Sequence, residues 1–424
     1  MRLSSSFYIN NRKKLMDRLP EETAVLIFAG EAAAMCADTE YRFLPDRNFW
    51  YLTGLDYQRG KLILIKHKGD LFETRLYAPV KDAMVERWHG KTMSFEELAE
   101  LSGIDTADIR PLDEFDNDLM ELFGGDSPLT PASDWESIMQ ESKDISGRLA
   151  AINKERMPID ISRDLIELRM VKTPEEIEAI KAAGRITEAA LEDMKKHIRP
   201  GVTELELYTA LEYGMASRGS LIPAFGTITA IGSNSFYLHH GDPEGEDGVI
   251  AQPGDLIQID VGARVAGYCA DISRVYFVGD RSEGIRAFEN EDRRFLLLDL
   301  ITELRKAAFN YIRPGVNFNM LNEEMKTITV NWLKQQGIVD EGFGVEDARA
   351  YYWHNTGHHL GLDVHDCAVK QKLFEPGNCL AIEPGVYIPE WNVGFRIEDD
   401  VLVTEDGCEL LTGGQERVED VVIK

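Results

Sequence analysis

The sequence has few cysteines, a shortage of basic residues and no long apolar run. Its five cysteines are spread over 424 residues without a CxxC pair, so neither a disulfide framework nor a thiolate zinc site is expected. No segment reaches the roughly 20 consecutive apolar residues of a membrane span. These absences argue against a disulfide-rich scaffold and against an integral membrane protein.

Acidic residues outnumber basic ones by 74 to 46, which gives a formal net charge of -28. A chain of this charge repels polyanions, and no stripe of Lys and Arg locally reverses the sign. We therefore expect no nucleic-acid partner. Residues 1–14 lack the apolar stretch and small-residue cleavage site of a signal peptide. Together with the cysteine usage, this predicts a cytoplasmic protein.

The length and the composition predict two folded domains. Hydrophobic residues make up 44% of the chain, and 424 residues exceed one ordinary domain. Strands are predicted at three apolar runs broken by Gly, Asp and Asn: 24–28, 49–52 and 62–65. Helices are expected near residues 94–101 and 133–154. We expect an α/β domain over residues 1–162 and a second domain over residues 163–424.

The second domain contains the sequence Ile-Arg-Pro-Gly-Val twice, at residues 198–202 and 312–316. Capping boxes begin at Thr173 and Thr203, so one helix is expected on each side of the first copy. The second copy also lies between two helical patterns, at 294–311 and 319–336. Because the flanks match as well as the five residues, the pattern predicts an internal duplication.

Each half is also expected to contain an acidic hairpin. In the first, residues 256–261 and 270–277 flank a Gly-bounded turn, and Asp260 and Asp271 are nearly equidistant from its centre. This predicts that they are close to cross-strand partners, with Cβ atoms ~5 Å apart. In the second, Glu383 and Glu398 are equidistant from a turn at 389–392. Paired bare carboxylates repel, and a cation between them removes the penalty.

Four of the nine histidines lie between the two hairpins, within residues 354–365. A lone histidine is more often a packed or surface residue than a ligand, but this cluster is better explained by a site. A site of four carboxylates and one imidazole is rich in hard oxygen ligands. It suits Mn²⁺ or a similar divalent ion, and it differs from the thiolate sites that bind zinc. Two ions about 3.5 to 4 Å apart would lower the pKa of a bridging water and polarise a carbonyl. The expected chemistry is amide hydrolysis.

These motifs resemble those of the creatinase, aminopeptidase P and prolidase family of pita-bread metallopeptidases. The matching segments are 238–239, 260–263, 270–274, 357–365, 383–385 and 396–399, and residues 41–54 are similar to the opening domain of aminopeptidase P. The resemblance covers essentially the whole chain. It implies an α/β (α+β) fold with a creatinase-like N-terminal domain and a pita-bread catalytic domain that has an internal pseudo-two-fold repeat.

Carried over by position, the resemblance implies a set of site residues. The metal ligands would be Asp260, Asp271, His358, Glu383 and Glu398, with Asp271 and Glu398 bridging. Glu383 would also assist the attacking water, while His239 and His365 would stabilise the tetrahedral intermediate or carry a proton. The substrate pocket would include His354, Arg396, Tyr387 and Phe225. Structural support of the site is the alternative role for Arg396, and core packing is the alternative role for Tyr387 and Phe225.

The opening domain both matches the family and departs from it. Trp88 resembles a tryptophan that, in the family, reaches the active site of a neighbouring subunit. The chain has Leu44 where Arg is common, and Asn48 where Asp commonly precedes Phe49. These departures bear on substrate preference and subunit contacts, whereas the metal-binding motifs are intact.

The resulting prediction is a Xaa-Pro aminopeptidase that acts on peptides with proline second and binds two divalent ions. Mn²⁺ is the expected ion, with Co²⁺, Zn²⁺ and Fe²⁺ as alternatives, and a homodimer or homotetramer is the expected assembly. A prolidase limited to Xaa-Pro dipeptides shares every ligand and is the nearest alternative. A non-catalytic peptide-binding protein on the same fold is a third reading. Creatinase chemistry does not keep this ligand set, and methionine aminopeptidase does not need the first domain.

Overall fold

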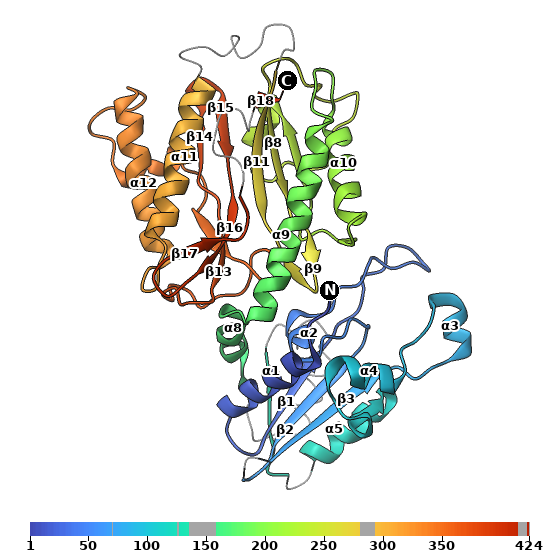
Figure 1. Ribbon diagram of the computed structural model, residues 1–424. Coiled ribbons are helices and arrows are strands. Elements are labelled where there is room, and N and C mark those ends of the chain that lie inside the picture. Colours follow the sequence, from blue (N-terminus) through green and yellow to red (C-terminus); the bar gives the residue numbers. More distant parts are fainter. Residues whose placement is uncertain (70, 125–126, 135–157, 280–292, 414–421, 424) are drawn as a thin grey trace. The chain divides into compact units, whose positions relative to one another are not determined.

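The computed structural model describes residues 1–69, 71–124, 127–134, 158–279, 293–413 and 422–423 (Figure 1). The chain divides into two compact units, Arg2–Arg169 and Met170–Lys424. Among the described helices, none combines the length and the apolar character needed to cross a bilayer.

The N-terminal unit is a six-stranded mixed sheet in the order β4-β3-β2-β1-β5-β6. Its strands are β1 (Thr23–Phe28), β2 (Lys61–Lys66), β3 (Phe72–Ala78), β4 (Ile109–Pro111), β5 (Thr130–Ser133) and β6 (Ile159–Asp160). Its helices are α1 (Ser5–Arg18), α2 (Arg47–Thr53), α3 (Ala83–His89), α4 (Phe95–Ser102), α5 (Phe115–Phe123) and α8 (Ser162–Met170). The strands predicted at 24–28 and 62–65 and the helix at 94–101 are confirmed.

The strand predicted at residues 49–52 is wrong, because this run lies in α2. Its ends explain the difference: the Asp46 carboxylate accepts hydrogen bonds from the backbone N–H groups of Asn48 and Phe49, and Gly54 ends the helix with φ 71°. The helix predicted at 133–154 lies almost wholly outside the described residues, and Ser133 itself ends β5.

The C-terminal unit repeats one arrangement of helices twice. The first half has α9 (Pro174–Lys195) and α10 (Glu204–Ala216), and the second has α11 (Arg293–Tyr311) and α12 (Phe318–Gln335). In both halves the sequence Ile-Arg-Pro-Gly-Val joins the helices, and its glycine has nearly the same backbone angle, φ 89° at Gly201 and 87° at Gly315. Both predicted capping boxes form, at Thr173 and Thr203.

The strands of the C-terminal unit repeat in the same way. The first half has β7 (Ile228–Ile231), β8 (Leu256–Val261) and β11 (Ile272–Val278), with β18 (Val422–Ile423) at the edge. The second has β12 (Gly357–His359), β13 (Cys379–Ile382) and β16 (Asp399–Val403), with β17 (Cys408–Leu410) at the edge. In each half the first three strands lie in chain order and are antiparallel. The predicted duplication is therefore visible in the fold.

Each pair of helices buries an apolar face against its own sheet. Side chains of α9 and α10 share a core with Ile257, Ile259 and Val261 of β8. Side chains of α11 and α12 share a second core with residues such as Leu380 and Val401. Figure 1 shows these helices flanking the strands of their halves. Each fully buried Leu or Ile contributes about 1.5 to 3 kcal/mol to such a core.

Candidate metal centre

The first acidic hairpin has a register different from the predicted one. Asp260 on β8 pairs with Ser273 on β11, and the two short strands β9 (Arg264–Val265) and β10 (Tyr268–Cys269) continue the same register. The turn is therefore Ala266 and Gly267, both with positive φ, at 47° and 80°. The expected centre was one residue too early, so Asp271 is displaced by two residues from direct pairing with Asp260. The two carboxylates remain diagonal neighbours on one face of the ladder.

The second hairpin has the predicted register. Strands β14 (Gly385–Ile388) and β15 (Val393–Arg396) continue the pairing of β13 with β16. Gly385 pairs with Arg396 and Ile382 with Asp399, so Glu383 and Glu398 lie opposite each other between the two ladders. Each half thus supplies one carboxylate at the end of its second strand and one just before its third strand.

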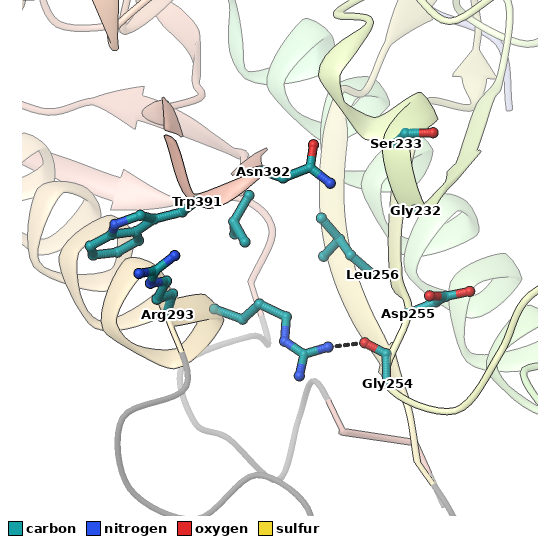
Figure 2. Close-up of a pocket in the computed structure, with 10 residues that line it drawn as sticks. Gly232, Ser233, Gly254, Asp255, Leu256, Arg293, Trp391 and Asn392 are labelled. Carbon is teal, nitrogen blue, oxygen red and sulfur yellow. Dashed lines mark hydrogen bonds between the residues drawn. The ribbon is translucent and has the colours of Figure 1, made fainter. Parts of the chain in front are cut away.

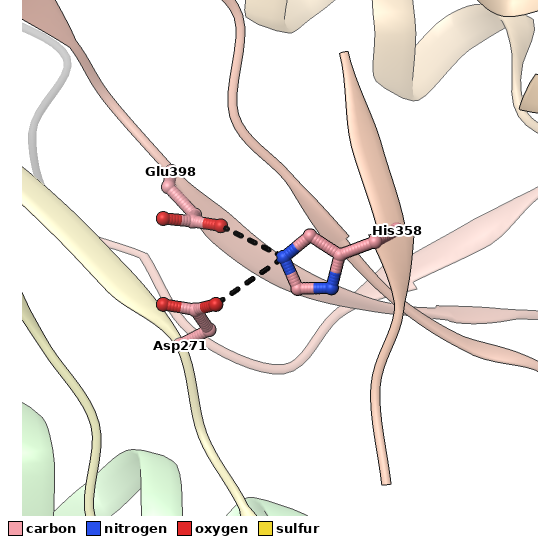
Figure 3. Close-up of side chains that lie close together, drawn as sticks. All are labelled: Asp271, His358 and Glu398. Carbon is pink, nitrogen blue, oxygen red and sulfur yellow. Dashed lines mark ion pairs between the residues drawn. The ribbon is translucent and has the colours of Figure 1, made fainter. Parts of the chain in front are cut away.

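His358, on β12, lies among these carboxylates. Its Nδ1 is 3.1 Å from the backbone oxygen of His359, which leaves Nε2 facing the acidic groups. Nε2 is 3.3 Å from Oδ2 of Asp271 and 3.8 Å from Oε1 of Glu398 (Figure 3). It is also 4.0 Å from Oε1 of Glu383. Ligand atoms of Asp271, His358 and Glu398 all lie within 4.8 Å of one another, a spacing that can hold a metal ion.

One cavity of about 260 Å³ brings most of the predicted site residues together. Its lining includes Asp260, Asp271, His358, Glu383, Glu398, His239, His354, His365 and Arg396. Tyr387 and Phe225 are outside this lining. The Tyr387 hydroxyl is 3.2 Å from Nε2 of His354, and Phe225 packs beside Gly262, where an added Cβ would lie 2.9 Å from the Phe225 ring.

Arg396 links the carboxylate of Asp260 to Leu238 and Ser273. Nη2 lies 2.5 Å from Oδ2 of Asp260 and donates to the backbone oxygen of Leu238 at 3.1 Å, while Nε donates to Oγ of Ser273 at 3.1 Å. The side chain is 3% exposed, so these contacts are shielded from solvent. A planar guanidinium suits this work because it donates in fixed directions. Arg396 therefore orients Asp260 within the cavity.

The carboxylates of the cavity are hard to ionise together. Burial, reinforced by neighbouring carboxylates, raises the pKa of Asp271 and of Glu398 well above the ordinary range. Burial also raises the pKa of Glu383 to about 7. Within the described part of the chain, one oxygen of each of Asp260, Asp271 and Glu398 is buried without a hydrogen-bond partner. Buried acceptors normally have partners, and divalent cations would satisfy these oxygens and remove the repulsion, so the residues fit a metal centre.

Two histidines at the rim are held neutral at physiological pH. Burial lowers the pKa of His354 to about 4. Partial burial, followed by the proximity of His358, lowers the pKa of His365 to about 4. A neutral imidazole can both donate and accept a hydrogen bond, which a proton-transfer role requires.

A second cavity, of about 490 Å³, lacks such a ligand set (Figure 2). Among the described residues that line it, Asp255 is the one carboxylate, and there is no histidine or cysteine. Arg293 lies over the Trp391 ring at 5.3 Å, and Arg294 donates to the backbone oxygen of Gly254. Of these two cavities, the smaller one therefore holds the candidate metal ligands.

Several residues that support the site were not assigned a role from the sequence. The buried Asp400 accepts a hydrogen bond from the backbone N–H of Asp271 at 3.1 Å. Arg274 donates to the backbone oxygen of Glu398 at 2.5 Å and pairs with Asp399 at 2.7 Å. Arg274 and Asp399 lie within the family-matching segments 270–274 and 396–399, and Asp400 directly follows the second, so their place in or beside these motifs is the signal that the sequence offers for them.

Asp366, the residue after His365, belongs to a buried ion pair. Nζ of Lys172 is 3.0 Å from Oδ2 of Asp366, and both side chains are at most 1% exposed. Lys172 also donates its backbone N–H to Gly377 at 2.8 Å. Because 194 positions separate the two charged residues, no local pattern in the sequence could reveal the pair.

Comparisons with known proteins decide the family. Residues 178–405 match the metallopeptidase family M24, and residues 8–129 match the aminopeptidase P N-terminal domain. The chain belongs to metallopeptidase family M24. The predicted two-domain fold and the predicted class, a metal-dependent peptidase, are therefore confirmed.

Relatives of this M24 chain match it over nearly its whole length. It is 30% identical to the Xaa-Pro aminopeptidase of Escherichia coli, over 97% of this chain and 95% of that protein. It is 29% identical to Xaa-Pro aminopeptidase 3 of Rattus norvegicus, over 97% of this chain and 83% of that protein. A structure of E. coli aminopeptidase P with the inhibitor Pro-Leu has a TM-score of 0.85 and 28% identity, covering 97% and 96% of the two chains. The predicted function agrees with the names of these relatives.

Proposed function

We propose that this chain is a Xaa-Pro aminopeptidase that removes the first residue from peptides with proline second. The observation that carries the proposal is the convergence of Asp260, Asp271, His358, Glu383 and Glu398 on one cavity. Its support is the similarity to Xaa-Pro aminopeptidases over 97% of the chain. The match of residues 8–129 to the aminopeptidase P N-terminal domain favours this function over a dipeptide-limited prolidase.

The five residues are proposed as ligands of two divalent ions, with Asp271 and Glu398 shared between them. Their hard oxygen donors favour Mn²⁺, and Co²⁺, Zn²⁺ and Fe²⁺ suit the same set. When bound, the ions would supply a Lewis acid for the scissile carbonyl and lower the pKa of a water molecule.

The remaining chemistry falls to side chains of the chain itself. Glu383, whose carboxylate lines the cavity, is suited to accept a proton from water and return it to the leaving amine. His239 and His365 line the same cavity and can donate hydrogen bonds to an oxyanion as it develops. Arg396 keeps Asp260 in place by the contacts described above.

A wall of aromatic rings adjoins the cavity and is proposed to receive the substrate's proline. Trp353 stacks on Tyr387 with ring centroids 4.4 Å apart and planes 10° from parallel. Tyr387 in turn contacts His354, which lines the cavity. Stacked rings present flat apolar surface and fixed edges, which suits a rigid five-membered ring. His354, Arg396, Tyr387 and Phe225 are the proposed substrate residues.

The proposed assembly is a homodimer or homotetramer in the cytoplasm. Helix α3 has no buried residue, and its Trp88 is 80% exposed. An exposed large aromatic side chain beside Met84 and Val85, which are also exposed, supports a subunit contact there. Within the described part of the chain, no disulfide joins any of the five cysteines, which supports a reducing compartment.

The test compares three peptides that differ in length or in the second residue. Purified protein with Mn²⁺ is incubated with a Xaa-Pro-Xaa tripeptide, the Xaa-Pro dipeptide and a Xaa-Ala-Xaa tripeptide, and the released amino acid is measured. The proposal predicts release from the Xaa-Pro-Xaa peptide and little from the alanine peptide. Cleavage of the dipeptide alone would make the chain a prolidase. Binding of the tripeptide without cleavage would favour the peptide-binding alternative.

A further inference from the structure

Glu204, the first residue of α10, has a completely buried carboxylate that ties down a distant segment. Its donors are the backbone N–H groups of Ile231 and Glu244, at 2.8 and 3.1 Å, and the side chains of Asn234 and His240, both at 2.9 Å. His240 donates in the tautomer that carries its proton on Nε2, since a carboxylate only accepts. All four donors lie within residues 231–244.

The backbone of α10 strengthens the same connection. The carbonyl oxygen of Glu204 accepts a hydrogen bond from Oγ1 of Thr229 at 3.0 Å. The N–H of Leu205 donates to the carbonyl oxygen of Glu244 at 3.0 Å. Residues 229–244 are therefore attached to the N-terminal end of α10 at both of their ends and in the middle.

Both carboxylate oxygens of Glu204 therefore act as hydrogen-bond acceptors, each with two donors. A buried carboxylate is tolerated when its oxygens are fully hydrogen-bonded, and each bond to a charged acceptor is stronger than a neutral one. An amide of the same shape would turn one oxygen into a donor that faces other donors. The Glu204→Gln change is thus nearly isosteric and selectively disrupts the connection.

His239 lies inside the connected segment, and both of its neighbours in the chain are fixed. The carbonyl oxygen of Leu238 accepts from Arg396, which also contacts Asp260. On the other side, His240 donates to Glu204. The His239 side chain lines the metal cavity, and no hydrogen bond to it is found among the described residues. Its position relative to the carboxylates is therefore set by its neighbours.

We propose that Glu204 is a positioning residue for His239, holding residues 231–244 so that the imidazole points into the metal cavity. The inference rests on the proposed function, because it concerns the role of His239 in peptide hydrolysis. Glu204 itself does not line the cavity. It acts through the backbone on either side of His239.

A double-mutant cycle separates this role from general structural support. Xaa-Pro-Xaa hydrolysis is measured with Mn²⁺ for the wild type, Glu204→Gln, His239→Ala and the double variant. Misplacement of a catalytic group by about 1 Å can cost about 10²-fold, so Glu204→Gln should lower kcat by 10- to 100-fold with KM little changed. In the His239→Ala background the same change should alter kcat by less than about twofold, the precision to which independent effects add. Equal losses in both backgrounds would overturn the proposal.

Glu206→Gln is the matched control, because Glu206 lies on the same first turn of α10 and caps it without contacting residues 231–244. It should leave kcat and bound metal, measured by elemental analysis, at wild-type values. Hydrogen–deuterium exchange of the metal-free protein gives a readout independent of activity. Glu204→Gln should speed exchange in residues 231–244, and unchanged exchange there would overturn the proposal. If the wild type cleaves none of the peptides, the proposed function is wrong. The exchange measurement then still tests whether Glu204 holds residues 231–244 in place.

Discussion

Glu383 and Glu398 lie directly opposite each other at the point where one hairpin passes from the β13–β16 ladder to the β14–β15 ladder. The strand pairing breaks at these two residues, so their side chains can turn toward His358 while their backbones stay fixed by the flanking pairs. A site built on strands holds its ligands more accurately than one built on loops. The opposed positions of these two residues therefore place two of the five proposed ligands.

Replacing one buried carboxylate should change the metal-free and the metal-loaded protein in opposite directions. Burial and neighbouring carboxylates raise the pKa of Asp271, so its charge destabilises the metal-free fold. Asp271→Asn removes that charge while keeping the shape, and should raise the Tm of the chelated protein. The same variant should bind less metal, so adding Mn²⁺ should raise its Tm less than that of the wild type. A lower Tm than wild type in both conditions would contradict this explanation.

The metal-free and metal-loaded proteins should also respond differently to pH. The pKa of Glu383 is raised by burial to about 7, from an ordinary value of about 4.3. A raised carboxyl pKa contributes stability that is present below the unfolded-state pKa and is lost as pH rises through about 7. Metal binding needs the ionised carboxylate, so affinity for Mn²⁺ should increase over the same interval. Thermal melts from pH 4.5 to 8 check both trends, and parallel curves with and without Mn²⁺ would be inconsistent with them.

The buried pair of Lys172 and Asp366 should matter for folding. Lys172→Met removes the buried cation that faces Asp366, and breaking a buried ion pair costs about 3 to 5 kcal/mol. The loss should appear as a lower urea midpoint with an unchanged slope. Lys181→Met is the matched control, since Lys181 pairs with the exposed Glu409 and the expected loss is about 1 kcal/mol or less. Similar losses in both variants would show that burial of the first pair has no special weight.

Arg396 should resist replacement by lysine. Its guanidinium reaches Asp260, Ser273 and Leu238 at once, and a single ammonium group cannot reproduce those directions. Loss of a group that orients a metal ligand typically costs about 10- to 100-fold in metal affinity or activity, which is the expected loss for Arg396→Lys. Mn²⁺ titration and kcat/KM measure it. Arg199→Lys changes an exposed arginine and serves as the control. Wild-type affinity in Arg396→Lys would rule out the orienting role.

Local patterns in the sequence anticipated much of this fold. The capping boxes at Thr173 and Thr203 predict helices because the Thr and Glu side chains satisfy backbone donors within one turn. The Glu383 hairpin was predicted correctly because its turn is centred where the spacing places it. The register of the Asp260 hairpin was predicted wrongly. Its turn consists of Ala266 and Gly267, both with positive φ, and the spacing of the glycines in the sequence did not show which two residues form it.

Contacts between distant residues were beyond such patterns. In the sequence, Glu204 resembles any acidic residue at the start of a helix. Its burial depends on hydrogen-bond donors that lie 27 to 40 residues further along the chain. The same holds for the pair of Lys172 and Asp366. Residues 49–52 show the converse, since an apolar aromatic run suits a strand or a buried helix equally well and the caps at Asp46 and Gly54 decide between them.

The most direct test of the account is metal-dependent hydrolysis of a Xaa-Pro-Xaa peptide by protein stripped of metal and then titrated with Mn²⁺, with Asp271→Ala measured in parallel. The account predicts no release of the first residue from the stripped wild type, release that rises and saturates with Mn²⁺, and little release from Asp271→Ala at any concentration. Release from the stripped protein at the full rate, or equal rates in the variant and the wild type, would contradict a metal centre built on these carboxylates.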